Sequence, residues 1–320
     1  MENDRATPSV SLEAAVVARR YFIDDRQKSE IADELKISRF KVARLLDEAR
    51  AAGIVRIYVD MPTGIDVPLG ESLASAYGIS RAIVVEAIAA APDATLGLLG
   101  RAAADYLKSI LRADDVLGVS WGSTLTTVVG ALGSLPSAEV VQLVGGIRGT
   151  NIGVGGVELV RRLAESTRGQ AFPLHAPLLV ATPEIAAQLR RDPSLADAIA
   201  RFDRLTIALV GIGSWRPPHS SLYTEFADAE RVILLERGAV GDVCTIVVDA
   251  DGQLVESSAS ARSIAIDGEQ LRRTPQVIAV AGGAAKVAAI GAVLRTGLVS
   301  TLVTDSTTAV ALVRDHADPS

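Results

Sequence analysis

The fold class is decided by a short stretch near the middle of the chain, Asp115-Val116-Leu117-Gly118-Val119-Ser120-Trp121-Gly122-Ser123-Thr124. Its apolar run predicts a buried strand, because no polar residue interrupts it at alternating positions. The glycine and the hydroxyl residues that follow predict a tight turn and the start of a helix. A strand that leads through a turn into a helix is the first half of a βαβ unit.

The same pattern recurs along most of the chain. Strands are predicted at residues 82–86, 115–120, 139–143, 174–180, 205–210, 243–248, 276–281 and 298–304. Helices are predicted between them at residues 95–111, 123–132, 154–166, 183–190, 283–294 and 307–313. Strands separated by helices of this length predict an α/β fold with a mostly parallel, doubly wound sheet covered on both faces.

Composition agrees with this fold class and excludes several kinds of chemistry. The 320 residues are 49% hydrophobic but only 4% aromatic, with 27 glycines, which is typical of buried parallel strands and small-residue helices. The single Cys244 excludes an internal disulfide, and the three histidines lie far apart in the sequence, so we expect no metal site and no cofactor. No signal sequence or long apolar run is present, so we expect a cytoplasmic protein.

The charge distribution separates the first 60 residues from the rest. They contain 11 basic and 11 acidic side chains, whereas the remainder carries the whole net charge of −6. Within the first part, residues 36–56 contain six cations and two carboxylates, a net charge of +4. We expect this segment to face an anion.

Three helices are predicted in this N-terminal part, at residues 11–23, 29–35 and 39–52, followed by a short strand at 54–59. The short break at Lys36-Ile37 and the helix cap at Ser38 are typical of a helix-turn-helix, whose second helix enters the major groove of DNA. The candidate DNA-binding residues are Lys28, Ser38, Arg39, Lys41 and Arg44. The alternative is a short bundle with a solvated basic face. We therefore expect a helix-turn-helix domain at 1–60, a linker at 61–68, and an effector-binding and oligomerisation domain at 69–320.

Four predicted strand ends run directly into glycine-rich turns. They are residues 119–124, 142–149, 208–214 and 279–286, the last ending at Lys286. Ligands of open α/β sheets bind at the carboxyl ends of the strands, so together these turns favour a small polyol or a ligand with an oxyanion. Neither the Walker pattern nor Gly-x-Gly-x-x-Gly with a following acid is present, which disfavours a nucleotide. Each turn taken alone is more often a matter of tight-turn geometry than of ligand binding.

The chain resembles the SorC-type bacterial transcriptional regulators over nearly its whole length. The resemblance rests on Lys28-Ser29-Glu30-Ile31-Ala32 with Ile37-Ser38-Arg39, on Gly118 to Thr124, on Gln142 to Gly146, on Ala176 to Leu178, on Ala208 to Gly213, and on Gly241 to Cys244. Its most specific part is Ala279 to Gly283, followed by Lys286-Val287 and Leu302 to Asp305. The resemblance implies a large domain that folds like phosphosugar isomerases, binds a sugar, polyol or sugar phosphate, and assembles into dimers or tetramers on operator DNA.

The resemblance also implies a set of effector-binding residues. One end of the ligand would be surrounded by Ser120, Gly122, Ser123 and Thr124. The candidate cations for a phosphate or acidic group of the ligand are Lys286 and Arg262. Asp242 and Asp305 would either hold sugar hydroxyls or cap neighbouring helices. The remaining candidates are Gln142, Gly145, Gly146, Gly211 and Gly213. Some phosphosugar-sensing relatives have Gly-Gly-Thr-Thr where this chain has Gly122-Ser123-Thr124-Leu125, a departure that weakens the case for a phosphorylated ligand.

Two other classes of protein are considered. A sugar-phosphate isomerase or deaminase with an accessory N-terminal domain would need a positioned general base, commonly a carboxylate with a histidine. His175 lies in an apolar setting and His219 in a loop, so neither is an obvious candidate. An oligomeric scaffold would bind no metabolite. We therefore predict a DNA-binding transcriptional regulator that is not an enzyme.

Overall fold

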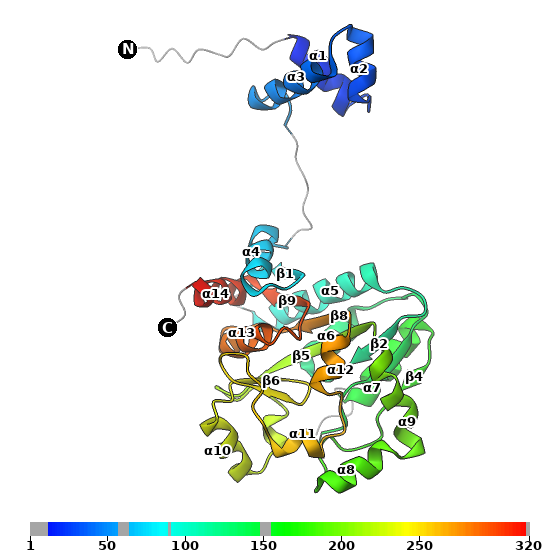
Figure 1. The fold of residues 1–320 in the computed structure, drawn as a ribbon, viewed down its shortest axis with the longest axis vertical. Helices are drawn as coiled ribbons and strands as arrows, with labels where there is room; N and C mark the ends of the chain where they lie inside the picture. The colour runs from blue at the N-terminus through cyan, green and yellow to red at the C-terminus, as the bar shows by residue number, and fades with distance from the viewer. Residues whose placement is uncertain (1–11, 57–63, 89–90, 148–154, 318–320) are drawn as a thin grey trace. The chain divides into compact units, whose positions relative to one another are not determined.

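The computed structural model describes residues 12–56, 64–88, 91–147 and 155–317. The chain divides into two compact units, Met1–Thr63 and Gly64–Ser320 (Figure 1). The predicted linker at 61–68 overlaps the start of the second unit. Its residues 61–63 lie outside the described residues, whereas Val67 and Pro68 open helix α4 (Val67–Tyr77). That helix begins here because Asp66 Oδ1 accepts a hydrogen bond from the Leu69 N–H at 3.0 Å and so caps it.

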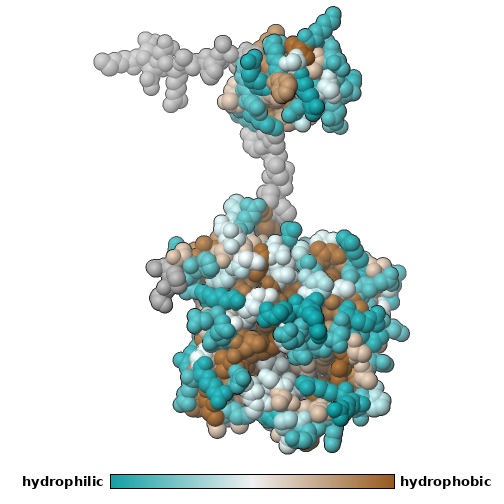
Figure 2. Space-filling model, viewed as in Figure 1, coloured by the Kyte–Doolittle hydropathy of each residue, from teal (hydrophilic) through white to brown (hydrophobic). Residues whose placement is uncertain are grey.

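The N-terminal unit consists of three helices, α1 (Leu12–Phe22), α2 (Lys28–Leu35) and α3 (Arg39–Ala51). Its core is a small apolar cluster to which each helix contributes, including Val17, Ile31 and Leu45. Lys36 ends α2 in the left-handed conformation, with φ 52°. The surface of this unit is mostly hydrophilic, with small apolar patches (Figure 2). The predicted cap at Ser11 and the end of the predicted strand at 57–59 lie outside the described residues, while residues 54–56 form no strand.

The turn between α2 and α3 forms as the sequence predicts. Ser38 Oγ accepts a hydrogen bond from the Lys41 N–H at 3.1 Å and caps α3. This bond satisfies one of the N–H groups that the first turn of a helix leaves without an intrahelical partner. The second helix of the pair therefore starts at a defined residue.

The C-terminal unit is built on a sheet with the strand order β1-β9-β8-β5-β2-β3-β4, in which all neighbours are parallel (Figure 1). These strands are β1 (Arg81–Val85), β2 (Val116–Val119), β3 (Glu139–Gln142), β4 (Ala171–Phe172), β5 (Ile207–Ser214), β8 (Gln276–Val280) and β9 (Thr301–Asp305). The far end of β5 continues beyond its parallel neighbours and pairs antiparallel with β6 (Gly241–Val243), which in turn pairs with β7 (Ile246–Val248).

Helices cover both faces of this sheet. The remaining helices are α5 (Pro92–Ile110), α6 (Ser123–Ala131), α7 (Gly156–Thr167), α8 (Pro183–Arg190), α9 (Pro193–Ala200), α10 (Asp228–Glu236), α11 (Ser258–Arg262), α12 (Gly268–Arg273), α13 (Val287–Arg295) and α14 (Ser306–Ala317). Along β5, Ile207 and Leu209 belong to the apolar cluster of α5, α6 and α7, while Ala208 and Val210 belong to that of α4, α13 and α14. Successive strand residues point to opposite faces, so the prediction of a doubly wound α/β fold is confirmed.

Two predicted strands of the C-terminal unit differ most from the structure. Residues 174–180 form isolated bridges rather than a strand, because Pro177 has no N–H group to donate to a ladder. Residues 243–248 form parts of two strands, because Cys244 turns the chain with φ 55°. Within the part of the chain that the structure describes, no helix is long and apolar enough to cross a lipid bilayer.

Candidate ligand pocket and nucleic-acid interface

A pocket opens where the order of the parallel strands reverses. From β2 the chain proceeds outward to β3 and β4, and it then returns to β5 on the other side of β2 before continuing to β8 and β9. Connections therefore leave β2 and β5 in opposite directions, which creates a crevice at their carboxyl ends. The described residues that line it are Ser120, Trp121, Gly122, Ser123, Thr124, Leu125, Val144, Gly211, Ile212, Gly213, His219, Ser220, Ser221, Asp242, Cys244 and Lys286.

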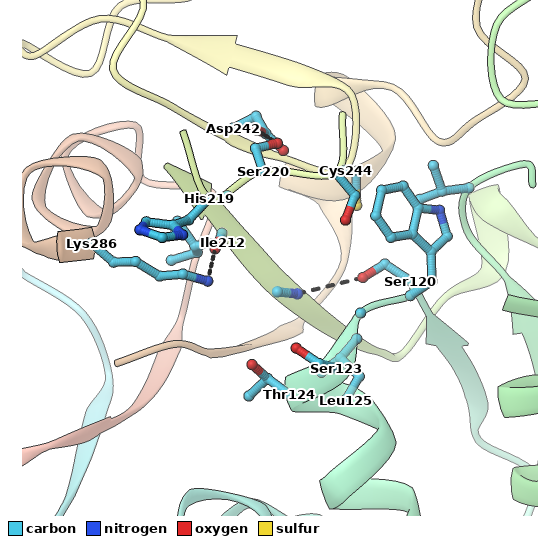
Figure 3. Close-up of a pocket in the computed structure, with 16 residues that line it drawn as sticks. Ser120, Ser123, Thr124, Leu125, Ile212, His219, Ser220, Asp242, Cys244 and Lys286 are labelled. Atoms are coloured by element: carbon cyan, nitrogen blue, oxygen red, sulfur yellow. Dashed lines mark hydrogen bonds between the residues drawn. The ribbon is translucent and has the colours of Figure 1, made fainter. Parts of the chain in front are cut away.

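One side of the pocket is the end of β2 and the start of α6. Ser120 is nearly buried, and its Oγ accepts a hydrogen bond from the Gly211 N–H at 3.4 Å, which joins β2 to β5 (Figure 3). Gly122 caps α6 with φ 138° and has no side chain to accept from the first-turn N–H groups. Those groups and the hydroxyls of Ser123 and Thr124 line the pocket as hydrogen-bond donors at a helix N-terminus.

The opposite side of the pocket holds a buried carboxyl group (Figure 3). Asp242 on β6 is only 6% exposed, and its Oδ1 accepts hydrogen bonds from Trp215 Nε1 at 2.8 Å and from Ser220 Oγ. Gly213 lies against this group, because a Cβ added there would be 2.5 Å from Asp242 Oδ1. Burial raises the pKa of Asp242 to about 6, although the bonds from Ser220 and Trp215 and the charge of Lys286 oppose the rise.

A single lysine contributes positive charge to the pocket. Lys286 lies just before α13, and its Nζ donates a hydrogen bond to the Ile212 backbone oxygen at 2.9 Å. Burial lowers the pKa of its ammonium group, and the nearby Asp242 opposes this shift. An ammonium group has three donors. The structure describes one hydrogen bond from Lys286 Nζ, so this side chain has donors to offer a ligand.

In the N-terminal unit, the exposed residues of α3 form the candidate nucleic-acid interface. Arg39 and Arg44 are exposed, and within the described residues neither forms an ion pair. Lys41 Nζ, in contrast, lies 2.7 Å from Glu13 Oε1 on α1. Lys28 Nζ lies 5.7 Å from the centre of the Tyr21 ring. The helix thus presents two arginines with no carboxylate in its first turn.

Comparison with known proteins places both units in one family. The family model Sugar-bind, a sugar-binding domain, matches residues 64–314, which span nearly the whole C-terminal unit. The Deoxyribonucleoside regulator of Bacillus subtilis (strain 168) is 32% identical over 317 residues, 98% of this chain and 99% of the relative. The chain belongs to the SorC-type family of transcriptional regulators.

A further sequence match and a structure match extend the comparison. The Sorbitol operon regulator of Klebsiella pneumoniae is 28% identical over 306 residues, 93% of this chain and 96% of that protein. The crystal structure of the full-length sorbitol operon regulator SorC from Klebsiella pneumoniae has a TM-score of 0.74 at 25% identity, covering 94% of this chain and 98% of that one. The similarity therefore includes the helical N-terminal unit as well as the α/β unit.

The structure brings together eight of the effector-binding candidates that the sequence and the SorC-type resemblance indicate. The candidates that line the pocket are Ser120, Gly122, Ser123, Thr124, Gly211, Gly213, Asp242 and Lys286. They come from four segments that are far apart in the sequence. The parallel sheet brings three of these segments together, because it aligns the carboxyl ends of its strands. Asp242 joins them from β6, which pairs antiparallel with the far end of β5.

Three other candidates lie outside the pocket lining, and each has a structural role there. The Gln142 side chain is fully buried and bonds the Val144 oxygen and the Leu174 N–H at 2.7 and 3.1 Å. Gly145 and Gly146 lie against the backbone of residues 176–177, so close that a Cβ on Gly145 would be 2.8 Å from the Pro177 oxygen. These residues support the end of β3.

Two charged candidates also lie outside the described lining. Arg262 Nη2 is 2.6 Å from Glu230 Oε1, and its Nη1 donates to the Val180 oxygen at 3.3 Å. Asp305 accepts from the Gly283 N–H at 2.8 Å and from the Thr308 N–H at 2.9 Å, so it caps α14 and holds the turn before Lys286. Of the two roles open to Asp305, the structure shows the capping role.

The pocket also contains residues that the sequence did not single out as ligands. The connection after β5 contributes His219, Ser220 and Ser221, and the hairpin of β6 and β7 contributes Cys244. The signal available in the sequence was weak: a Trp-Arg-Pro-Pro-His-Ser-Ser run at residues 215–221 directly after a buried strand. The contacts of Trp215 and Ser220 with Asp242 show that this run folds back over the strand end.

Proposed function

We propose that this SorC-type regulator binds operator DNA through α3 and that a small sugar, polyol or sugar phosphate in the pocket at β2 and β5 controls this binding. The unit up to Thr63 would bind DNA, and the unit from Gly64 would bind the effector and assemble copies of the chain. The observation that carries the proposal is that one chain combines an exposed pair of arginines on a helix-turn-helix with a polar pocket at the strand-order reversal. A regulator acts where the DNA is, so we expect it in the cytoplasm.

The chemistry of the pocket supports a ligand with several hydroxyl groups. Ser123 and Thr124 can donate or accept, Lys286 can only donate, and the Asp242 carboxyl group accepts when it is ionised. The relatives named above are called regulators of deoxyribonucleosides and of a sorbitol operon. Sorbitol and the sugar of a deoxyribonucleoside both carry more than one hydroxyl group. We therefore place the effector in this chemical class.

A thermal-shift panel of polyols, free sugars and sugar phosphates tests the effector. A ligand present at 100 times its dissociation constant stabilises the folded state by about 2.7 kcal/mol, a shift that is readily measured. A panel without any shift would favour a scaffold. A compound that stabilises the C-terminal unit and also changes affinity for operator DNA would support the proposal.

Two variants separate a phosphorylated effector from a neutral one. If the effector carries a phosphate, Lys286→Met should weaken its binding by about 1.5 to 3 kcal/mol, the range for a hydrogen bond to a charged group. Ser123→Ala should then have a smaller effect. A larger loss of affinity with Ser123→Ala than with Lys286→Met would indicate a neutral sugar or polyol held by hydroxyls. Isothermal titration calorimetry measures both, and the melting temperature of each ligand-free variant shows that its fold is retained.

An enzymatic activity is the second candidate, because one observation favours it. A carboxyl group with a raised pKa, Asp242, and a histidine, His219, line the same pocket, and this combination is used for proton transfer. The curated relatives are named as regulators. Turnover of the effector identified in the panel, assayed with wild type and Asp242→Asn, decides between the two classes.

Assembly of the chain is part of the proposal, because a single helix-turn-helix reads only one half-site. Two recognition helices enter successive major grooves when they are about 34 Å apart, so operator half-sites follow the symmetry of a dimer or tetramer. Effector and operator must then influence each other's affinity by the same factor. Sedimentation on operator DNA, and effector titrations with and without that DNA, test both statements. A monomer on its operator would contradict this part of the proposal.

A further inference from the structure

The recognition helix exposes a large aromatic side chain that the core of the unit does not use. Phe40, the second residue of α3, is 90% exposed, whereas Val42, Leu45 and Leu46 of the same helix are buried. Exposure of a phenyl ring to water is unfavourable relative to its burial, because burial removes its apolar surface from water. Single exposed apolar residues are common, so its surroundings decide whether this ring has a role.

The residues around Phe40 carry the positive charge that suits a DNA base edge and the phosphates beside it. Phe40 lies between Arg39 and Arg44, which are also exposed and form no ion pair within the described residues. Phe40 and Arg44 are four residues apart and so lie on the same face of the helix. The first turn of α3 contains no acidic residue. Positive charge on both sides of the ring favours an anionic partner over an apolar one.

The other residues near this end of α3 are already engaged. The hydroxyl of Ser38 accepts the Lys41 N–H, and the ammonium group of Lys41 lies 2.7 Å from Glu13 Oε1. Of the four residues that begin the helix, 38 to 41, only Arg39 and Phe40 therefore present side chains without a described hydrogen-bond or ion-pair partner. A polar contact to a base would come from Arg39, and an apolar contact would come from Phe40.

We infer that Phe40 reads sequence by contacting the C5-methyl group of a thymine in the major groove of the operator. In a helix-turn-helix, the N-terminal residues of the second helix meet the base edges, and phenylalanine is one of the side chains that pack on this methyl group. The inference rests on the proposed DNA-binding function. It adds an apolar specificity contact between the two arginines.

The test uses a change in DNA that removes only the methyl group. The full-length wild type first selects a duplex site from a random-sequence library. Each thymine of that site is then replaced singly by deoxyuridine, which has the same hydrogen-bonding groups but no methyl group. At one position per half-site, the wild-type affinity should fall about fourfold, which corresponds to one buried methyl group.

Phe40→Ala makes the second half of a double-mutant cycle. This variant should bind the thymine site at least fourfold more weakly than the wild type, and it should bind the thymine and deoxyuridine sites equally. Ile23→Ala, which also removes an exposed apolar side chain of this unit, should keep the wild-type affinity and the full deoxyuridine effect. Because Phe40 is exposed, the melting temperature of Phe40→Ala should match that of the wild type.

Three results would overturn the inference without affecting the proposed function. One is a wild type that selects a site but is insensitive to deoxyuridine at every position. Another is a Phe40→Ala variant that keeps the full deoxyuridine effect. The third is a Phe40→Ala variant that changes the sedimentation of the free protein while its DNA affinity is unchanged, which would make Phe40 a contact between copies of the chain. Failure of the wild type to select any site would instead contradict the proposed function.

Discussion

Replacement of Asp242 by asparagine should stabilise the protein at neutral pH and have little effect in acid. Asparagine keeps a carbonyl oxygen that can accept from Trp215 and Ser220, so the hydrogen bonds at this position can persist. It carries no charge, so it avoids the cost of burying one. The cost arises because Asp242 is only 6% exposed, and burial raises its pKa from an ordinary 3.8 to about 6.

The magnitude and the pH range follow from this shift. A carboxyl group whose pKa is raised by folding favours the folded state when protonated and opposes it when ionised. The cost is therefore absent below pH 3.8, grows between pH 3.8 and about 6, and is complete above that range. A shift of roughly two units, at about 1.4 kcal/mol per unit, corresponds to about 3 kcal/mol.

The measurement is urea unfolding of wild type and Asp242→Asn from pH 4 to pH 7.5, at one protein concentration and without ligand. Trp215 donates to Asp242, so tryptophan fluorescence reports on this region. The free energy of unfolding of the variant, relative to wild type, should rise from near zero at pH 4 to about 3 kcal/mol at pH 7.5. A difference between the two proteins that does not change with pH would refute the reasoning, as would a variant that is less stable at pH 7.5.

Two further predictions test the packing of the pocket and of the turn. Gly213→Ala should destabilise the protein by about 1 to 3 kcal/mol, because the new Cβ would lie 2.5 Å from Asp242 Oδ1. Gly211→Ala is the matched control, because the nearest atom to its new Cβ is 4.0 Å away, and equal losses in denaturant unfolding would contradict the prediction. Ser38→Ala removes the cap of α3 and should lower the stability of the N-terminal unit by about 0.5 to 2 kcal/mol. Circular dichroism during thermal unfolding measures this, with Ser38→Asp as the variant that should restore the cap.

The parts of the fold with strong local signals were predictable from the sequence. Helix α8 has the predicted bounds, because Thr182 caps it and proline follows at its first position. Residues 174–180 were misleading, because an apolar run resembles a strand whether or not its backbone can pair, and here Pro177 prevents a regular ladder. Helix α4 was missed since Gly70 lies within its pattern; there the helix approaches the sheet so closely that a Cβ would be 2.5 Å from the Ala82 oxygen.

The site was predictable where glycine and hydroxyl residues follow strands, as at residues 120–124. It was not predictable where a side chain enters from a distant connection. Ser220 reaches the pocket because its Oγ bonds Asp242 across 22 residues of sequence, and nothing local in the chain indicates that contact. Arg262 is a second example: the resemblance to SorC-type regulators made it a cation candidate for the ligand, and in the structure it lies outside the pocket lining and pairs with Glu230.

The reversal of strand order between β2 and β5 separates the part of the chain that forms the pocket from the part that would select its ligand. The crevice exists because the chain leaves these two strands in opposite directions, and no individual side chain is needed to open it. Several of the residues that line the pocket belong instead to the connection after β5 and to the hairpin of β6 and β7. Exchange of those segments would change which ligand the pocket accepts while the buried sheet stays the same. A lineage of regulators with this architecture can acquire new signals without rebuilding its framework.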